Sequence, residues 1–203
     1  MLSRLRPVLA ALALAGASAL PGQAQTPRVP AEFHLTAYVA GFERPMEVRQ
    51  SGLRRRIDVA SGAVVQTFVA DRGRGALTVM TAAGRRRLAF VFPLAREDAM
   101  APLPLDLAQF RDARLTRIGA SNVAGRPCAV WRYAGWLGGS GTACATPEGL
   151  VLQLKPDGRK TPVFQVLSIT FSRQDPKWFA PSPDFQVAAV PGAGGTTPPL
   201  PAG

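Results

Sequence analysis

Few residues in this sequence have the type and spacing that catalysis requires. The single histidine, His34, lies between Phe33 and Leu35, a setting more typical of a strand or surface residue than of a general base. Glu97 and Asp98 are adjacent. Neighbours on an extended chain point apart, whereas a general acid and base must face each other around a substrate. The sequence therefore predicts neither enzymatic activity nor a cofactor.

Cys128 and Cys144 are the only cysteines, and their chemistry depends on the compartment. In an oxidising compartment an even pair is typically joined as a disulfide. A bridge over a loop of this size stabilises by about 3 kcal/mol on the chain-entropy model. One cysteine pair and a distant His34 cannot supply the four ligands of a structural zinc site, so we expect a disulfide and no metal.

The N-terminal residues have the order of a secretory signal. Arg4 and Arg6 precede an apolar run over residues 8–14, and small residues with a Pro-Gly break follow. The run is shorter than the roughly 20 residues that span a bilayer, and a buried core helix is the alternative interpretation. Cleavage is expected after Ala24, with Ala19 as second choice. No cysteine lies near either site, which predicts a periplasmic protein without a lipid anchor.

Three segments follow from this interpretation. Residues 1–24 are the expected signal peptide and residues 25–190 a single β-rich domain. Residues 191–203 are rich in proline and glycine and contain little that could offset their ordering entropy, so we expect a disordered tail.

The chain is strongly basic, with a net charge of +11. Without the expected signal peptide, 22 basic and 13 acidic residues remain, a charge of +9. Nucleic acid is a poor partner for an exported protein whose aromatic residues do not alternate with its arginines. Two interpretations stay open: a solvated surface, or contact with an anionic membrane surface. The second would use arginines at or beside successive turns, which could form one basic rim: Arg54, Arg56, Arg72, Arg74, Arg85 and Arg87.

Alternation with period two dominates the chain and predicts short strands separated by glycine turns. The first group forms an antiparallel meander over residues 46–50, 55–59, 64–69, 77–80 and 87–92. The second group covers residues 115–118, 129–133, 141–145, 150–154, 163–171 and 185–190. Residues 94–105 are expected to be a long loop, and short helical turns are predicted at 105–111, with Asp106 near the start, and at 175–179. About nine or ten strands must bury one face in a sandwich, a closed barrel or a curved open sheet.

The second half of the chain has a recognisable order of short motifs. Gly125-Arg126-Pro127-Cys128 is followed by Trp131-Arg132-Tyr133, then by Cys144-Ala145-Thr146-Pro147-Glu148-Gly149, and Asp175-Pro176-Lys177-Trp178-Phe179 closes the series. This order resembles DUF4412, a family of small exported bacterial proteins, over about residues 44–190. That family is in turn similar to the periplasmic lipoprotein carriers of the LolA/LppX type. The resemblance implies a mainly β fold: a single curved antiparallel sheet, or half-barrel, with one or two short helices. The sequence departs from the carriers in lacking a long helix after the signal, and Glu148 stands where an aspartate is usual.

The resemblance also implies a function. The first hypothesis is a periplasmic binding module whose concave face holds an apolar ligand, such as an acyl chain, a lipid or a lipidated protein. The expected lining residues are Val48, Ile57, Phe68, Met80, Phe90 and Phe92. The alternative is an envelope interaction protein with a packed core, which binds another protein or the membrane surface. A further set of aromatic residues could line either a core or a cavity: Trp131, Tyr133, Phe171, Trp178 and Phe179.

Overall fold

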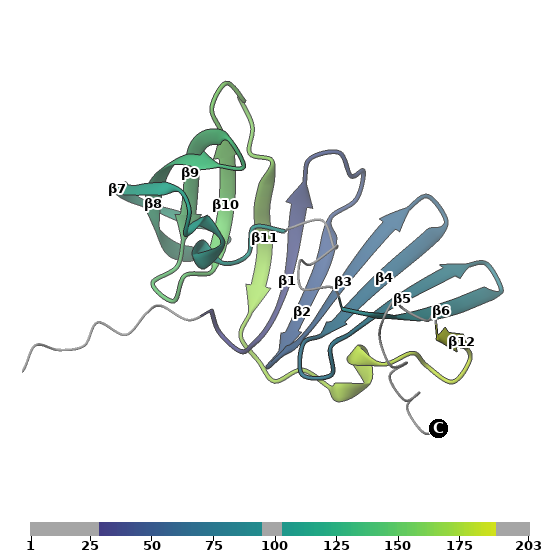
Figure 1. The fold of residues 1–203 in the computed structure, drawn as a ribbon. Coiled ribbons are helices and arrows are strands. Elements are labelled where there is room, and N and C mark those ends of the chain that lie inside the picture. Colours follow the sequence, from purple (N-terminus) through teal and green to yellow (C-terminus); the bar gives the residue numbers. More distant parts are fainter. Residues whose placement is uncertain (1–28, 95–102, 190–203) are drawn as a thin grey trace, which may run out of the picture.

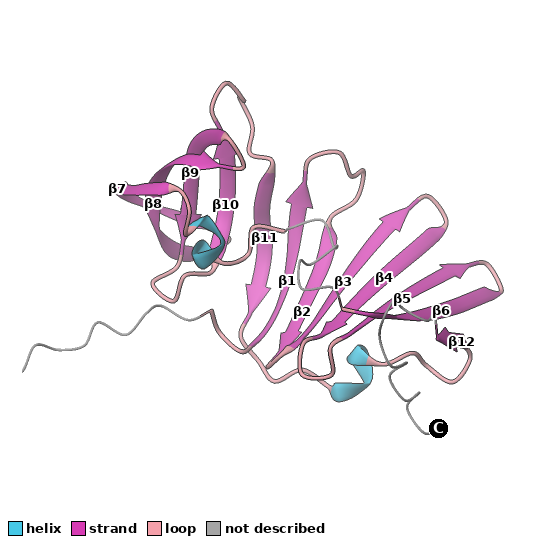
Figure 2. Ribbon diagram, in the orientation of Figure 1, coloured by secondary structure: helices cyan, strands magenta, loops and turns pink. Residues whose placement is uncertain are grey.

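The computed structural model describes residues 29–94 and 103–189, and these residues form a single curved sheet of twelve strands with two short 3-10 helices (Figures 1 and 2). The strands are β1 (Glu32–Val39), β2 (Met46–Ser51), β3 (Arg54–Ser61), β4 (Val64–Asp71), β5 (Ala76–Ala83), β6 (Arg86–Pro93), β7 (Arg114–Val123), β8 (Arg126–Trp136), β9 (Gly139–Ala145), β10 (Val151–Pro156), β11 (Phe164–Thr170) and β12 (Gln186–Ala189). The helices are η1 (Leu107–Phe110) and η2 (Pro176–Phe179). The predicted fold class, a mainly β chain with one open curved sheet, is confirmed.

The strand order is β12-β6-β5-β4-β3-β2-β1-β11-β10-β9-β8-β7. The predicted meander is present as β2 to β6, and β7 to β11 form the other half of the sheet (Figure 1). Two features differ from the prediction. The sheet has twelve strands rather than about nine or ten, because all eleven predicted ranges form strands and β1 adds one that was not predicted. In addition, β12 pairs with β6 in parallel, so the sheet is not wholly antiparallel. Parallel pairing is possible there because a long stretch of chain separates the two strands.

Strand β1 joins the two halves of the sheet, because it pairs with β2 on one side and with β11 on the other. Its alternation is clear: Phe33, Leu35 and Ala37 are buried, whereas His34 and Thr36 point to the opposite face. The same alternation with period two that predicted the other strands is therefore present in β1, which was not among the predicted strands.

Pairing across β1 to β6 defines the two faces of this half of the sheet. One row of directly paired residues runs across all six strands, and we call its side the front face: Leu35, Val48, Ile57, Phe68, Val79 and Phe90. The neighbouring row points the other way and defines the back face: Thr36, Glu47, Asp58, Thr67, Met80 and Ala89.

The main core lies where η1 and the segment before it pack against the sheet. Leu103, Leu105 and Phe110 join a buried cluster with residues of β1 to β3 and β8 to β11. Phe110 stacks on Trp136 with ring centroids 4.3 Å apart and meets Tyr133 at 5.4 Å. Burial of each large apolar side chain here stabilises the fold by roughly 1.5–3 kcal/mol.

Both predicted helical turns are present, and an aspartate caps each. Asp106 accepts a hydrogen bond from the backbone N–H of Ala108, and Asp175 accepts one from that of Lys177. Such caps satisfy N–H groups that the first turn leaves without a partner. The predicted disulfide between Cys128 and Cys144 is also present and joins the neighbouring strands β8 and β9.

The predicted signal peptide, its cleavage near Ala24, the disordered tail at 191–203 and the acidic pair Glu97 and Asp98 lie outside the described residues. Most of the predicted loop at 94–105 does so too.

Candidate functional site

Five of the six residues predicted to line an apolar site share the front face. Val48, Ile57, Phe68 and Phe90 are in one paired row, and Phe92 follows Phe90 by two positions on the same strand. Met80 is the exception. It pairs with Thr67 and Ala89 and points to the back face, because strand alternation places it opposite to Val79.

Burial divides these front-face residues into two groups. Val48 and Ile57 are part of the packed core, so the part of the concave sheet that they occupy is filled by protein. Phe68 and Phe92 are half-buried, and Phe90 keeps 37% of its surface exposed. The candidate site is therefore confined to β4, β5 and β6.

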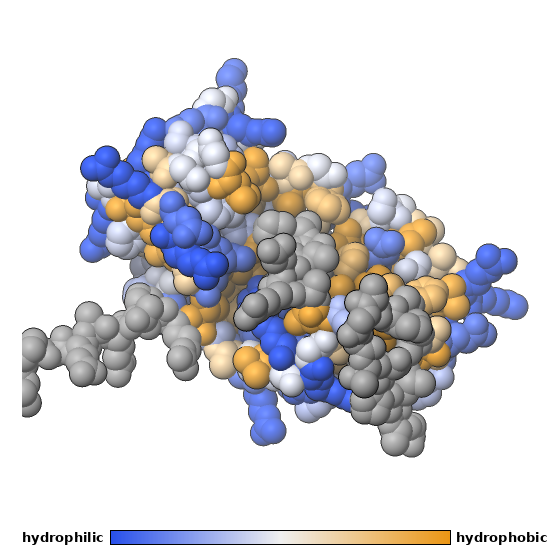
Figure 3. Space-filling view, viewed as in Figure 1, coloured by the Kyte–Doolittle hydropathy of each residue, from blue (hydrophilic) through white to orange (hydrophobic). Residues whose placement is uncertain are grey.

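On these three strands the front face presents a continuous set of apolar side chains that are half-buried or exposed. We call it the front apolar surface: Phe68, Leu77, Val79, Leu88, Phe90 and Phe92. Hydrophobic residues gather over the side of the sheet that faces the viewer in Figure 3. Leu77, Val79 and Leu88 were not in the predicted lining set, although the same alternation would have placed them there.

Arginines flank the front apolar surface along the strand direction. Arg86 is exposed and pairs with Ala83, two positions from Leu88 on the same face of β6. Arg55 pairs with Ala70 near the other end of the strands and donates a 2.7 Å hydrogen bond to Gln50. An apolar surface with cationic groups at its ends has the charge pattern that suits an anionic amphiphile.

The six arginines expected to form one basic rim do not do so. Arg72 and Arg74 lie in the β4–β5 turn, near Arg54 at the start of β3. Arg85 lies in the β5–β6 turn at the opposite end of the strands, beside Arg87. Successive hairpin turns alternate between the two ends of a meander, so adjacency in sequence does not bring them together. Arg54 and Arg56 do share the back face, as alternation predicts.

On the back face, arginines hold a C-terminal segment against the sheet. We call residues 174–185 the strap. Arg49 and Arg56 lie 4.4 and 5.3 Å from the ring centroid of Trp178. Arg54 lies over the ring of Phe179 and Arg87 over that of Phe185. Phe179 completes a small second core with Val69, Met80 and Ala89. The sequence interpretation missed this role, because cation–π pairs between distant segments leave no local pattern.

Hydrogen bonds and ion pairs hold Arg49, Arg56 and Arg87 in place. Arg56 contacts both carboxylate oxygens of Asp58, at 2.7 and 2.8 Å, and donates to the carbonyl of Trp178 at 2.8 Å. Thr67, which is buried, donates to the same Asp58. At the start of the strap the backbone N–H of Gln174 donates to Glu32 at 2.9 Å.

Two exposed aspartates of the strap have shifted pKa values. A hydrogen bond from the Lys177 side chain lowers the pKa of Asp175. The Ser182 hydroxyl lowers the pKa of Asp184, with Arg87 adding to the effect. Both carboxylates therefore stay ionised at neutral pH.

The remaining aromatic residues divide between core and surface. Tyr133 and Phe179 are buried in the two cores, and Trp131 packs half-buried against the larger one. Phe171 and Trp178 are exposed. Arg126 lies over the ring of Phe171 at 5.1 Å. Burial raises the pKa of Tyr133 above its ordinary value, and the negative charge of Asp157 adds to the shift.

His34 lies on the back face with its Nε2 atom 3.3 Å from Glu47 Oε2. This is an ion-pair distance, but the atoms are not aligned for a hydrogen bond. Within residues 29–94 and 103–189, no three side chains of histidine, cysteine, aspartate or glutamate group as metal ligands would. Neither helix in the same residues has the length and apolar character to cross a membrane.

Comparison with known proteins gives matches to solved structures alone. No family model matches the sequence, and no curated protein matches it. The resemblance to DUF4412 therefore stays a prediction. The chain is similar to MucB in complex with MucA(peri), at 17% identity over 78% of this chain, with a TM-score of 0.45. The complex structure of Pseudomonas aeruginosa MucA/MucB matches at 19% sequence identity over 78% of this chain, with a TM-score of 0.45. MucB alone matches at 16% identity over 79% of this chain, with a TM-score of 0.42. The chain spans 57%, 58% and 60% of those three chains, respectively, which is less than two thirds of their length.

Proposed function

We propose that this chain is a binding module of an exported compartment, and that the front apolar surface takes an acyl chain with an anionic headgroup. The observation that carries this proposal is the continuous set of half-buried or exposed phenylalanine, leucine and valine side chains on β4 to β6. A sheet face of this kind costs free energy when it stays in water, at roughly 25 cal/mol for each Å² of apolar area. Exposed apolar surfaces of this sort are typical of binding sites.

The charge at the ends of the surface supports an amphiphile over a purely apolar ligand. Arg86 extends the row of Phe92, Phe90 and Leu88 toward the end of the hairpin. A carboxylate or phosphate at the end of an acyl chain would reach this guanidinium while the chain lies along the strand. The disulfide is consistent with an oxidising compartment.

We also propose that the module acts by binding and not by catalysis. The two cysteines are joined in a disulfide, and His34 is engaged with Glu47 on the face opposite to the front apolar surface. These two structural contacts support a binding role for the module.

The test is uptake of a fluorescent fatty acid by the purified protein, together with native mass spectrometry before and after lipid extraction. Phe90→Glu places a charge in the middle of the surface at an exposed position, so the fold should tolerate it. Ile118→Glu on β7, where the isoleucine is 55% exposed, is the matched control. We expect binding by the unaltered protein and by Ile118→Glu, and at least a tenfold loss with Phe90→Glu. Absence of uptake by the unaltered protein, or equal uptake by Phe90→Glu, would contradict the proposal.

A protein partner is a second candidate, favoured by strand β7. It ends the strand order of the sheet, and nine of its ten residues are not buried. Within the described part of the chain its outer edge pairs with no strand, so an extended segment of another protein could add to it. Replacing Thr116 with proline would block that addition, and capture of an envelope protein by the unaltered chain but not by this variant would favour this candidate.

A further inference from the structure

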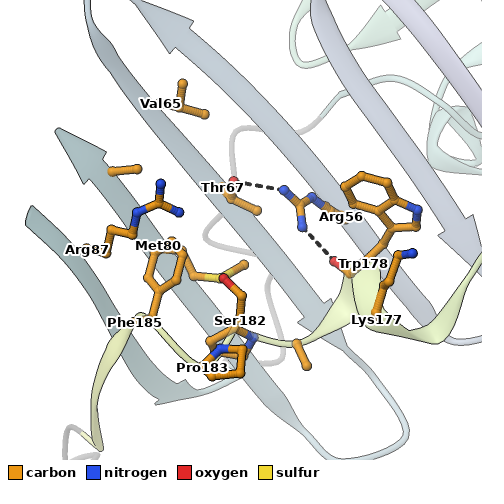
Figure 4. A pocket seen from close by; sticks show the side chains of 13 residues that line it. Arg56, Val65, Thr67, Met80, Arg87, Lys177, Trp178, Ser182, Pro183 and Phe185 are labelled. Carbon is orange, nitrogen blue, oxygen red and sulfur yellow. Dashed lines mark hydrogen bonds between the residues drawn. The ribbon is translucent and has the colours of Figure 1, made fainter. Parts of the chain in front are cut away.

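The strap and the back face border an open cavity that is separate from the front apolar surface. Its volume is about 660 Å³, within the roughly 300–1,000 Å³ typical of small-molecule sites. The floor consists of back-face side chains from β4 and β5, namely Val65, Thr67, Met80 and Ala82. The strap forms the opposite wall (Figure 4).

The two sides of the cavity are built alike. Figure 4 shows Arg87 beside Phe185 on one side and Arg56 beside Trp178 on the other, with Met80 and Thr67 between them. Each side therefore presents one aromatic ring and one guanidinium, and the space between them has an apolar floor.

The charges around the cavity are unequal. Three cationic residues line it, Arg56, Arg87 and Lys177, and no aspartate or glutamate is among the lining residues of the described chain. Their carboxylate partners Asp58, Asp184 and Asp175 lie outside the lining. The lining of the cavity thus offers cationic hydrogen-bond donors and no carboxylate, and each cation has a carboxylate partner outside the lining.

The two arginines differ in how firmly they are held. Arg56 is bound by Asp58 through two short contacts and is largely shielded from water. Arg87 contacts Asp184 at 2.8 Å, but their side chains are 44% and 52% exposed. An exposed pair contributes little to stability, so Arg87 can exchange Asp184 for another carboxylate at small cost.

From this arrangement we propose that the cavity binds a small aromatic carboxylate. The ring lies on Met80 between Phe185 and Trp178, where aromatic contacts stabilise it. The carboxylate accepts charge-assisted hydrogen bonds from Arg87. This site is independent of the acyl-chain site proposed above, because it lies on the other face of the sheet.

The experiment is titration of the full chain with 2-naphthoate, followed by isothermal calorimetry and by the fluorescence of the tryptophans. We expect saturable binding to the unaltered protein, and at least tenfold weaker binding of 2-naphthylmethanol, which has the same ring without the charge. Arg87→Gln should weaken 2-naphthoate at least tenfold. Arg85→Gln, which alters the neighbouring exposed arginine outside the cavity, should not change it.

Two further variants keep the result interpretable. Ala82→Phe fills the floor without removing a charge and should abolish binding even if Arg87→Gln proves unstable. Phe90→Glu should leave naphthoate binding unchanged, which separates this site from the front apolar surface. Absence of saturable binding by the unaltered protein, equal affinity of the neutral analogue, or unchanged affinity of Ala82→Phe would overturn the proposal.

Discussion

Arg56 makes two contacts with Trp178: its guanidinium lies 5.3 Å from the centre of the indole ring and donates a 2.8 Å hydrogen bond to the backbone carbonyl of the same residue. Arg49 lies over the same ring at 4.4 Å. Two arginines from neighbouring strands thus hold one exposed tryptophan, and through it the strap, against the back face.

Trp178→Ala should therefore loosen the strap. Cation–π pairs contribute from about 0.5 to about 2 kcal/mol each, depending on desolvation. We expect a loss of about 1–2 kcal/mol in the free energy of unfolding, measured by denaturant titration, and faster cleavage within the strap in limited proteolysis. Trp178→Phe, which keeps an aromatic ring, is the control and should lose less than half as much. Equal proteolysis of all three proteins would contradict this role.

Gly141 lies where no larger residue fits. A Cβ at this position would be 2.6 Å from the hydroxyl oxygen of Tyr133 and 2.7 Å from the Cα of Pro156, and closer still to the carbonyl of Lys155. Because two of these atoms belong to the backbone of β10, the strands would have to separate. Gly141→Ala should destabilise by about 1–3 kcal/mol, as overpacking does, with a lower melting temperature.

Gly119 on β7 is a matched control for that change. It is also a strand glycine, but a Cβ there meets nothing within 4 Å. Gly119→Ala should leave the melting temperature within the error of measurement. If both variants melted alike, the contacts of Gly141 would not limit the packing.

Loss of the Cys128–Cys144 disulfide should destabilise by about 3 kcal/mol, because the bridge closes a loop with a sequence separation of 16. The double variant with alanine at both positions should unfold at lower denaturant than the oxidised protein. A reducing agent should shift the unaltered protein by a similar amount and the double variant not at all. A double variant as stable as the oxidised chain would show that the bridge adds little.

Alkaline pH should destabilise the fold in part through Tyr133. Burial raises the pKa of its phenol in the folded state, so the folded protein keeps the neutral form after the unfolded chain has begun to ionise. The contribution is complete below the pKa of about 10 of an unfolded tyrosine and is lost as pH rises through the folded value. Tyr133→Phe should therefore show a shallower fall in melting temperature between pH 9.5 and about 11 than the unaltered protein. Parallel curves would exclude this contribution.

Much of this structure could be predicted from local patterns. Alternation such as Arg55, Ile57 and Val59 against Arg54, Arg56 and Asp58 identifies a strand without knowledge of its partners, since the pattern depends only on the two faces of one strand. Asp106 and Asp175 marked the starts of the helical turns for an equally local reason, because a cap bonds the N–H groups of the next few residues. The two cysteines allowed a single bridge.

The candidate sites depended on relationships that local patterns do not contain. Alternation within β5 puts Met80 and Val79 on opposite faces, but which of the two lies beside Phe68 depends on the register between β4 and β5, and Met80 was therefore assigned to the wrong face. The arginines of the turns were expected to form one basic rim, but successive hairpin turns lie at opposite ends of the strands and separate them. No sequence pattern in the strap predicts the contacts of Trp178 with Arg49 and Arg56, which are more than 120 positions away in the sequence.

The sequence by itself determined a β chain with its strands, turns, helix caps and disulfide, because each of these follows from the period of a strand, the conformational freedom of nearby residues or the number of cysteines. The tertiary structure alone decided that Val48 and Ile57 are packed in the core while Phe90 stays exposed, that β12 runs parallel to β6, and that Arg56 and Arg87 line a cavity. The physical reason is that burial and charge pairing depend on which distant segments are packed together, and that choice is made by the whole chain at once.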